Sequence, residues 1–486
     1  MKPRRSRKAE LPPNAMGGGK SHAETAESAE NAEFKMTELG SIPVDWEVKR
    51  LGDVSSLITK GTTPTSLGCD FEHYGINFIK AESISDNGDF ISGKFAHIDE
   101  QTDVLLSRSR LKEGDLLFSI AGVLGRVALV TDEILPANTN QALAVIRLAT
   151  NDAIDKRYLF FALKSEYLKD RVKEENVAAA QANLSLQDVN EFHIAVPPIA
   201  EQRRIAGALS DVDELISALG KLIEKKRNIK TGAMQQLLTG KTRLPGFGAN
   251  SLRSNHSHAE AQRGRGIEFK QTELGPIPVD WEMKRFDKVF SMLRNNTYAR
   301  ESLTDEREGA FNIHYGDILV KYGALVDFEK DEVPCLKFGI EPNKDMLQDG
   351  DLIFADTAED EMVGKAIEVT GVNGYRAVAG LHTVLCRPNA SVFAPGYLGY
   401  YINSHAYHNQ LLPLITGTKV SSVSRAGFAS TYVCIPPFAE QKAIAAVLSD
   451  MDAEIAALEA DRAKYERIKS GMMQELLTGK TRLKGE

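Results

Sequence analysis

The chain has 486 residues, which is too long for one ordinary hydrophobic core and predicts two or more domains. Its composition, 42% hydrophobic and 26% charged, is typical of a soluble globular protein, and no apolar run approaches the roughly 20 residues that cross a bilayer. The net charge of -8 excludes a protein that coats nucleic acid by charge alone, but it allows local basic patches.

Residues 1–33 are predicted to form a disordered tail, because Ala, Glu, Ser, Gly and Pro dominate and large apolar residues are almost absent. The basic residues at its start are followed by no apolar segment, so we expect no secretory signal. The four cysteines are far apart and have no metal-ligand spacing. They predict reduced thiols in a cytoplasmic protein without a metal site of its own.

Two globular regions follow, and each begins with the same opening segment. FKMTELGSIPVDWEVKRLGDV begins the region 34–195, and FKQTELGPIPVDWEMKRFDKV begins the region 269–434. In the first region, the runs INFIK, GDLLFSI, RVALV and ALAVIRL predict short strands, and YLFFALKSEYLKDRVKEE predicts a helix. In the second, GDLIFA, KAIEV, HTVLC and YLGYYINSHAYHNQLL repeat that plan. Both regions therefore predict α+β domains, although their sequences otherwise differ widely.

Each globular region is followed by a long helix, over 196–244 and 435–486, and a linker spans 245–268. The first helical segment begins VPPIAEQRRIAGALSDVDELISAL and ends MQQLLTGKTRL, and the second begins IPPFAEQKAIAAVLSDMDAEIAAL and ends MQELLTGKTRL. The Pro-Pro pairs mark helix starts, and a helix from Ala200 to Leu238 would be roughly 58 Å long. An apolar seam at spacings of four and three residues predicts that the two helices pair with each other. The seam consists of Ile205, Leu209, Val212, Ile216, Leu219 and Ile223, and of Ile444, Leu448, Met451, Ile455 and Leu458.

Gly232 and Gly471 occupy equivalent places late in the two helices, where each costs about 1 kcal/mol relative to Ala. A close approach by another backbone, from the paired helix or from a partner protein, would explain that cost.

The duplication predicts a tandem repeat with an approximate two-fold relation, in which two antiparallel helices carry related domains at opposite ends. Such an arrangement suits duplex DNA, where half-sites on one face are about 34–36 Å apart. Since the globular regions differ, the half-sites would differ too. The expected target is a bipartite, non-palindromic sequence with an unread gap.

The repeated PPxAEQ, LSDxD and LLTGKTRL motifs resemble the conserved regions of the specificity (S) subunits of type I restriction–modification systems. The resemblance extends over the whole chain except the tail and the linker. It includes KGTTPT (60–65), INFIKAESI (76–84), GVLGRVAL (122–129) and NTNQALAVI (138–146), and, less closely, NIHYGDI (312–318) and GTKVSSVS (417–424). It implies two target recognition domains, joined by two long antiparallel helices, that each bind one half of a split DNA site.

The same resemblance implies a non-catalytic subunit that acts with partners. The helices would dock two methyltransferase (M) subunits, and restriction (R) subunits would complete the nuclease. This chain would carry no cofactor, while S-adenosylmethionine would bind the methyltransferase and ATP and Mg²⁺ the restriction subunit. Two other functions remain as alternatives: a self-sufficient DNA methyltransferase or nuclease, and a coiled-coil scaffold without a DNA function.

Motifs for an enzyme are incomplete. GKT at 240–242 and 479–481 lacks the first glycine of a P-loop and follows a helix instead of preceding one. VPPI and IPPF have an apolar residue where an amino-methyltransferase needs a polar one. Asp45 lies too close to Glu47 and Lys49 for a PD…ExK nuclease, and the same holds at Asp280, so we expect Trp46 and Trp281 to anchor these segments in a core. His256 and His258 lie in the linker and predict a solvated segment.

Candidate DNA contacts are chosen for residue type. Arg and Lys suit guanine, Asn and Gln suit adenine, Thr suits the thymine methyl group, and phosphates accept from Arg, Lys, Ser and backbone amides. In the first region they are Lys60, Gly61, Thr62, Thr63, Lys80, Arg126, Asn140, Gln141, Gln181 and Asn183. In the second they are Arg294, Asn295, Asn296, Thr297, Tyr298, His314, Tyr315, Lys321, Lys419, Ser421 and Ser422. Arg108, Arg110 and Lys112 form a basic cluster that fits a solvated face equally well.

Overall fold

The computed structural model of the protein describes residues 27–28, 33–150, 153–178, 183–247, 267–307, 309–342, 345–389, 391–417 and 419–484. Most of the predicted tail, most of the predicted linker, and with it His256 and His258, lie outside the described residues. The chain divides into a first unit, Met1–Ser217 with Ala463–Glu486, and a second unit, Ala218–Arg462.

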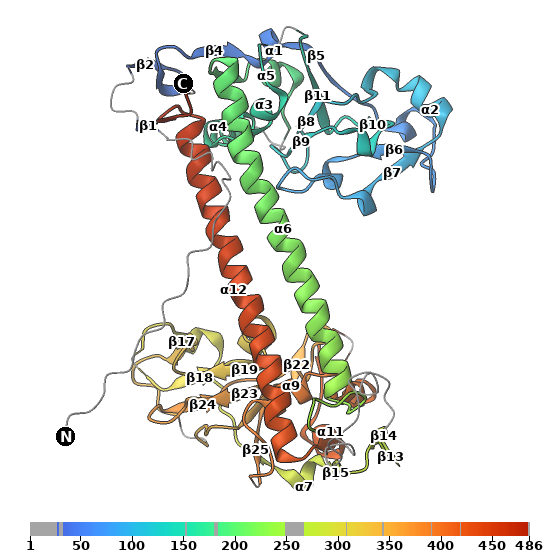
Figure 1. Cartoon of the computed structure of the whole chain (residues 1–486), viewed down its shortest axis with the longest axis vertical. Coiled ribbons are helices and arrows are strands. Elements are labelled where there is room, and N and C mark those ends of the chain that lie inside the picture. The colour runs from blue at the N-terminus through green and yellow to red at the C-terminus, as the bar shows by residue number, and fades with distance from the viewer. Residues whose placement is uncertain are drawn as a thin grey trace, which may run out of the picture. The chain divides into compact units, whose positions relative to one another are not determined.

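Two long helices contribute to both units: α6 (Ile199–Leu237) and α12 (Phe438–Leu476), each of 39 residues (Figure 1). Both begin just after a Pro-Pro pair, and their bounds agree within one residue with the helix predicted over Ala200–Leu238 and its counterpart. The predicted fold class, α+β with two long paired helices and an internal duplication, is confirmed.

The first unit consists of small sheets and short helices. The hairpin β2 (Phe34–Thr37) and β3 (Gly40–Pro43) leads to an antiparallel pair of β4 (Glu47–Arg50) with β12 (His193–Val196). A four-stranded sheet has the order β5 (Ser55–Lys60), β11 (Leu143–Leu148), β8 (Leu116–Ser119), β9 (Val127–Leu129). A three-stranded sheet has the order β10 (Ala137–Thr139), β6 (Ile76–Ile79), β7 (Ala96–Ile98), and β1 (Glu27–Ser28) pairs with β28 (Thr481–Arg482). The short helices are α1 (Leu51–Val54), α2 (Glu100–Leu105), α3 (Lys156–Ala162), α4 (Glu166–Ala178) and α5 (Leu186–Asn190).

The second unit repeats this plan with extra strands. The hairpin β13 (Phe269–Thr272) and β14 (Gly275–Pro278) leads to the pair β15 (Glu282–Arg285) with β27 (Tyr432–Ile435). A five-stranded sheet has the order β16 (Phe290–Leu293), β25 (Thr383–Pro388), β21 (Leu352–Ala355), β23 (Ala366–Thr370), β19 (Leu325–Asp327). A four-stranded sheet has the order β17 (Leu303–Thr304), β20 (Cys335–Leu336), β18 (Phe311–Ile313), β24 (Ala377–Ala379), and β22 (Thr357–Ala358) pairs with β26 (Ser421–Ser422). Its helices are α7 (Phe286–Val289), α8 (Tyr315–Val320), α9 (Tyr397–Ile402), α10 (His405–Leu411) and α11 (Arg425–Ser430).

The central strands form because their apolar runs are buried on both faces. All four residues of β8 are buried, as are all four of β21, so these runs do not alternate between apolar and polar residues. The predicted strands INFIK, GDLLFSI, RVALV and ALAVIRL correspond to β6, β8, β9 and β11. In the second unit GDLIFA, KAIEV and HTVLC correspond to β21, β23 and β25. Each predicted helical stretch divides into two helices, α3 with α4 and α9 with α10.

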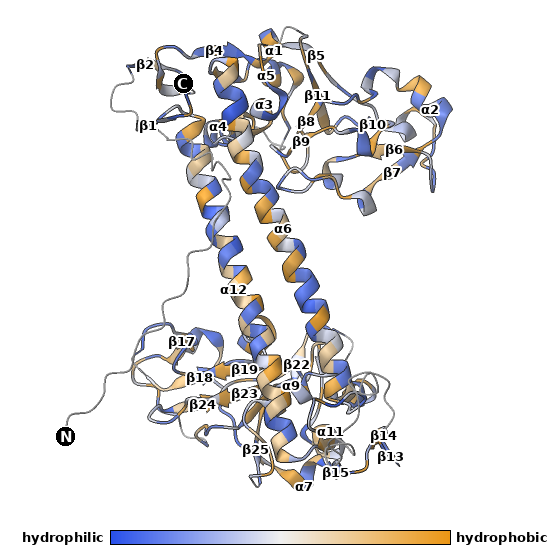
Figure 2. Ribbon diagram, in the orientation of Figure 1, coloured by the Kyte–Doolittle hydropathy of each residue, from blue (hydrophilic) through white to orange (hydrophobic). Residues whose placement is uncertain are grey.

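The long helices pair in an antiparallel manner in each unit. In the second unit Lys226 bonds Glu454 at 2.6 Å and Lys230 bonds Asp452, so residue numbers rise along α6 while they fall along α12. In the first unit Asp213 bonds Lys469 at 2.5 Å. Figure 2 shows hydrophobic and hydrophilic residues alternating along both helices.

The seam residues are buried to different extents. Ile205 and Leu209 lie in the core of the first unit with Leu476 and Leu477, and Ile444 and Leu448 lie in the core of the second with Leu237 and Leu238. Ile216, Ile223 and Ile455 are also buried, whereas Val212, Leu219, Met451 and Leu458 are half-buried. Burial on one side of each helix fits the predicted seam. The role of the seam residues in pairing the helices stays a prediction.

The two late helix glycines do not have the predicted neighbour inside the chain. No described atom beyond the local helix lies within 4 Å of a Cβ built at Gly232 or Gly471. The prediction that the paired helix's backbone approaches them closely is therefore wrong. All four cysteines are free, and no helix among the described residues is both long and apolar enough to cross a membrane.

Candidate nucleic-acid interface

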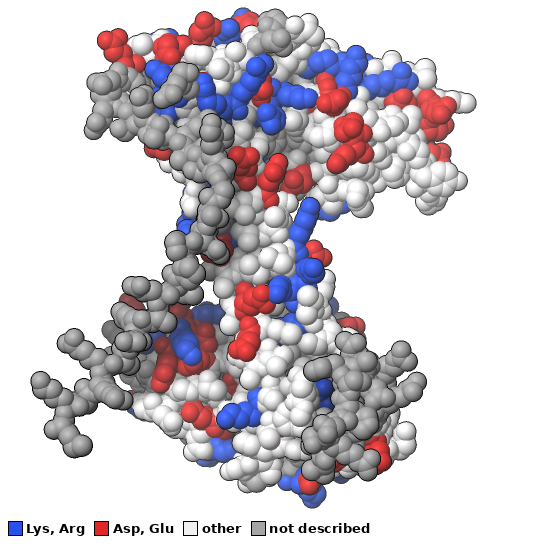
Figure 3. All heavy atoms as spheres, in the orientation of Figure 1, with Lys and Arg blue, Asp and Glu red and all other residues white. Residues whose placement is uncertain are grey.

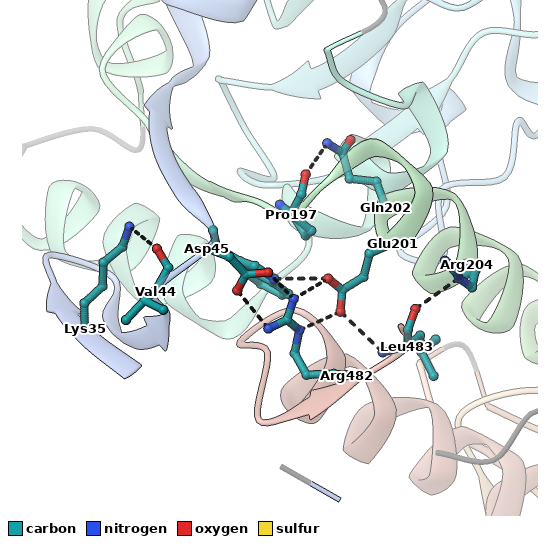
Figure 4. Close-up of polar contacts among 10 residues, drawn as sticks. Lys35, Val44, Asp45, Pro197, Glu201, Gln202, Arg204, Arg482 and Leu483 are labelled. Atoms are coloured by element: carbon teal, nitrogen blue, oxygen red, sulfur yellow. Dashed lines mark hydrogen bonds and ion pairs between the residues drawn. The ribbon is translucent and has the colours of Figure 1, made fainter. Parts of the chain in front are cut away.

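The motifs that the chain contains twice meet in two ionic clusters, each centred on a buried arginine. In the first arginine clasp (Asp45, Trp46, Glu201 and Arg482), the Arg482 guanidinium donates two hydrogen bonds to Glu201, both at 2.7 Å, and two to Asp45, at 2.8 and 2.9 Å (Figure 4). Trp46, fully buried, donates from Nε1 to Glu201 at 3.3 Å. The bonds to Glu201 and Asp45 raise the pKa of Arg482, and Arg482 lowers the pKa of Asp45.

The second arginine clasp (Arg243, Asp280, Trp281 and Glu440) has the same bonds. Arg243 donates to Glu440 from Nε and, at 2.6 Å, from Nη2, and it donates to both oxygens of Asp280 at 2.9 Å. Trp281 donates to Glu440 at 3.0 Å. Each clasp therefore joins an opening segment, the start of one long helix and the end of the other.

The clasps explain why the enzyme-like motifs are present without their chemistry. Gly479 of the second GKT has a φ of +69°, and a Cβ there would lie 2.5 Å from Pro43. Gly240 of the first GKT has a φ of +67°, and a Cβ there would lie 2.4 Å from Pro278. Each turn lets the segment after a long helix pack on an opening segment. Neither turn precedes a helix as a phosphate-binding loop does.

The Pro-Pro and ExK segments are also structural. Gln202 donates to the Pro197 carbonyl at 2.8 Å, and Gln441 donates to the Pro436 carbonyl at the same distance. Glu47 pairs with Lys49 at 2.8 Å on the surface, while Asp45 bonds Arg482 instead of joining that pair. Among the described residues, no group of three or more His, Cys, Asp or Glu side chains is placed to hold a metal ion.

Predicted DNA contacts of the first unit gather where several strands end. The backbone N–H of Gly61 donates to Asn140 at 3.1 Å, Ile120 donates to Ala142 at 2.8 Å, and Leu184 donates to Ile120 at 2.8 Å. These bonds place residues 60–63, 139–142, 120–126 and 183–184 in one contiguous set, which we name the first loop row. Gly61 is required there, since a Cβ would lie 1.7 Å from the Thr139 carbonyl oxygen.

Within the first loop row, the Thr63 hydroxyl donates to Gln141 Oε1 at 2.6 Å, and Asn183 is exposed. Arg126 pairs with Asp86 at 2.8 Å. Lys80, outside the row, pairs with Glu82 at 3.3 Å and lies over the Phe71 ring. Gln181 lies outside the described residues. Of the basic cluster, Arg108 donates to the Lys60 carbonyl at 3.1 Å, while Arg110 pairs with Asp103.

The second unit has an equivalent second loop row, formed by residues 294–297, 356–358, 380–382 and 421–423. Asn295 donates to the Gly380 carbonyl at 2.9 Å, the N–H of Asp356 donates to the His382 carbonyl at 3.2 Å, and β22 pairs with Ser421 and Ser422 of β26. The row therefore brings together Arg294, Asn295, Thr297, Ser421 and Ser422, with Lys419 exposed beside it.

Two predicted contacts of the second unit are buried instead. Asn296, 2% exposed, donates to Asn312 Oδ1 at 3.0 Å. His314, 7% exposed, accepts the Gly316 N–H on Nδ1 at 3.2 Å and caps α8, and its burial lowers its pKa. Both side chains stabilise the loops and do not face solvent.

The remaining predicted residues have partners within the unit. Arg294 pairs with Asp345 at 3.4 Å, Lys321 donates to the Glu332 carbonyl at 2.6 Å, and Tyr298 donates to the Glu341 carbonyl at 3.4 Å. The ring of Tyr315 lies 4.6 Å from that of His314. Figure 3 shows basic side chains interspersed with acidic ones over both units on the face drawn.

Sequence reasoning missed Arg425, which lies beside the second loop row, and His382, which lies in it. Arg425 donates to the Leu293 carbonyl at 2.8 Å and to Asn295 at 3.3 Å, so it supports the loop that begins at Arg294. His382 has a positive φ of 52°, and among the described residues no other non-glycine residue does. Its sequence context, HTVLC, predicts a strand and gives no sign of this conformation.

Comparisons with known proteins agree with the resemblance found in the sequence. Residues 43–228 match the family model described as the type I restriction modification DNA specificity domain. The putative MjaX specificity subunit of Methanocaldococcus jannaschii is 26% identical over 93% of this chain and 97% of its own length. The MjaVIII specificity subunit of the same organism is 24% identical over 91% of this chain and 94% of its own.

The fold is also that of a solved structure of a type I restriction–modification system, described by its complex assembly and conformational transition. The likeness has a TM-score of 0.53 at 17% identity and covers 90% of this chain and 99% of that one. The resemblance to type I specificity subunits is thus confirmed in sequence and in fold.

Proposed function

We propose, on the premise that the chain is a type I restriction–modification specificity subunit, that each unit recognises one half of a bipartite, asymmetric DNA sequence through its loop row. The observation that carries this proposal is the combination of equal scaffolds and unequal loops. The two rows are built on equivalent strand ends and equivalent backbone hydrogen bonds, yet they present different side chains.

The side chains suit direct readout of bases. The first loop row offers Lys60, Thr62, Thr63, Asn140 and Gln141, which include a lysine for guanine, two amides for adenine and two threonines for the thymine methyl group. The second offers Arg294, Asn295, Thr297, Ser421 and Ser422, in which an arginine replaces a lysine and no glutamine occurs. Two rows of unlike chemistry predict two unlike half-sites.

The chain itself would carry out no chemistry. In this proposal two methyltransferase subunits dock on the long helices, bind S-adenosylmethionine and methylate adenine, and restriction subunits supply the ATP- and Mg²⁺-dependent cleavage. The role of the chain is to place them on one sequence. The enzyme alternative is weaker, because the methyltransferase-like Pro-Pro segments serve as helix starts and the nuclease-like Asp45 belongs to the first arginine clasp.

The test is methylation by defined combinations of proteins. The chain and the methyltransferase encoded with it are expressed together, and each alone, in a host without adenine methylation, and the DNA is read by long-read sequencing. We expect one split motif, methylated only when both are present. Methylation by this chain alone would support the enzyme alternative. Co-purification of the two proteins without sequence-dependent methylation or DNA binding would support the scaffold alternative.

A further inference from the structure

His382 is held in a backbone conformation that few non-glycine residues adopt. Its φ of 52° lies in the left-handed region, which costs a non-glycine residue on the order of 1–3 kcal/mol, although Asn, Asp and His adopt it more often than other residues do. It stands in the three-residue connection between β24 and β25, and its side chain is 49% exposed. Because the His382 side chain is not buried, glycine at this position would serve the fold equally well.

The surrounding backbone fixes this connection on both sides. Gly380 donates to the Ile313 carbonyl at 2.8 Å and accepts from the Thr383 hydroxyl at 2.7 Å. The His382 carbonyl accepts from the Asp356 N–H at 3.2 Å. The connection therefore keeps its path, and the histidine has to follow it.

The imidazole ring is oriented by two neighbours. The edge of the Tyr315 ring packs against it, with centroids 5.3 Å apart and planes at 80°. The Nδ1 atom lies 3.8 Å from Asp356 Oδ1, and that carboxylate is itself fixed by the Thr357 hydroxyl at 2.9 Å. A carboxylate on the Nδ1 side favours a proton on Nδ1, which leaves Nε2 as an acceptor in the neutral ring.

We propose that His382 contacts a base of the second half-site and that Asp356 is its positioning residue. The ring stands between the two predicted contact groups of the second loop row, since Gly380 bonds Asn295 on one side and β22 bonds Ser421 and Ser422 on the other. An acceptor at Nε2 selects a base with an exocyclic amino group in the major groove, which is adenine or cytosine. This inference rests on the proposed function and names one determinant of its specificity.

The first unit provides a natural comparison. Its connection between β10 and β11 has the same length, and its last residue, Ala142, accepts from the Ile120 N–H at 2.8 Å just as His382 accepts from Asp356. Ala142 offers only a methyl group and has no positive φ. A connection of this length and with this backbone bond therefore does not by itself require a positive φ, so the strain is particular to the connection that carries the imidazole.

The test uses a substitution that the fold tolerates. His382→Gly removes the ring and relieves the strain, so the variant folds at least as well as the native chain. The chain–methyltransferase complex methylates a DNA library in which both half-sites are randomised. We expect discrimination at one adenine or cytosine position of the second half-site to fall on the order of tenfold. Every other position should be unchanged, and the matched control Ala142→Gly should leave the second half-site intact.

Asp356→Asn separates positioning from a purely structural role. We expect it to weaken discrimination at the same single position, whereas a structural defect would reduce methylation equally for all sequences. Full discrimination in His382→Gly, or a uniform loss at both half-sites, would overturn the assignment. A native complex that selects no split sequence would instead overturn the proposed function, so the two failures are distinguishable.

Discussion

The two arginine clasps and the two loop rows differ in how far the chain allows its duplicated halves to diverge. Arg482 and Arg243 bond the same set of partners, a Glu at a helix start and an Asp before a buried Trp. The loop rows share only backbone bonds, such as those accepted by Ala142 and His382.

The difference follows from burial. A guanidinium that is 4% or 5% exposed must keep its carboxylate, because an unpaired buried charge is strongly unfavourable. A loop that is held by its own backbone leaves its side chains free to change. One chain can therefore keep its two clasps alike while its two loop rows differ.

The largest effect should come from breaking one clasp. Arg482→Met leaves Glu201 buried without its charge partner, and we expect a loss of about 3–5 kcal/mol in the unfolding free energy of the first unit. Hydrogen exchange of each unit measures the change and locates it. Arg50→Met, which removes only a surface pair with Asp53, is the control and should change little. An equal loss of protection in the second unit would contradict the independence of the clasps.

The buried carboxyl of Glu368 should make the second unit pH-sensitive. Glu368 accepts the N–H groups of Gly396 at 2.7 Å and Gly399 at 2.9 Å, and burial raises its pKa from 4.5 to about 7. The folded state binds the Glu368 proton more tightly than the unfolded state. The contribution of this carboxyl to stability is therefore complete below about pH 4.5 and is lost as pH rises to about 7.

The loss should amount to about 3 kcal/mol across that interval. Glu368→Gln cannot titrate at this position. The unfolding free energy of the native chain should therefore fall steadily, relative to that of the variant, from pH 4.5 to pH 7. Denaturant unfolding at several pH values measures this difference. Two parallel curves would show that the carboxyl does not titrate in this range.

Paired glycines should respond in opposite directions. Gly479→Ala forces a side chain into a left-handed turn against Pro43 and Trp46, and we expect it to destabilise the first unit by about 1–3 kcal/mol. Gly471→Ala meets open space in a helix and should stabilise the chain by up to about 1 kcal/mol. Thermal unfolding compares the two variants, and co-purification with the methyltransferase shows whether Gly471 admits a partner's backbone. Unchanged co-purification would refute that role.

The smallest effect should come from the exposed ion pairs between the helices. Arg227 and Glu459 lie 2.5 Å apart, but their side chains are 64% and 43% exposed. We expect Glu459→Ala to cost less than about 1 kcal/mol, and that cost should disappear at high salt. A cost that is large and independent of salt would mean that these pairs, and not the apolar seam, hold the helices together.

Local patterns predicted the helices and the central strands, because apolar spacing and Pro-Pro boundaries are properties of neighbouring residues. They could not predict the clasps, since Arg482 and Asp45 are 437 positions apart and only the fold brings them together. They also misplaced Asn296 and His314, whose polarity suits DNA but whose side chains are buried. The conformation of His382 was invisible for a similar reason, because its connection is bonded to Ile313 and Asp356, which are distant in the sequence.

The measurement that tests the account most directly is the methylated motif of a symmetrised chain. Residues 51–192 replace 286–431, so that both globular regions are the first one. The junctions are equivalent, because Leu51 bonds Phe192 at 2.7 Å and Phe286 bonds Thr431 at 2.8 Å beside the pairs β4–β12 and β15–β27. Assembled with the methyltransferase, this chain should methylate a palindrome made of the first half-site twice, with the original gap length. An asymmetric or unchanged motif would contradict the assignment of one half-site to each unit.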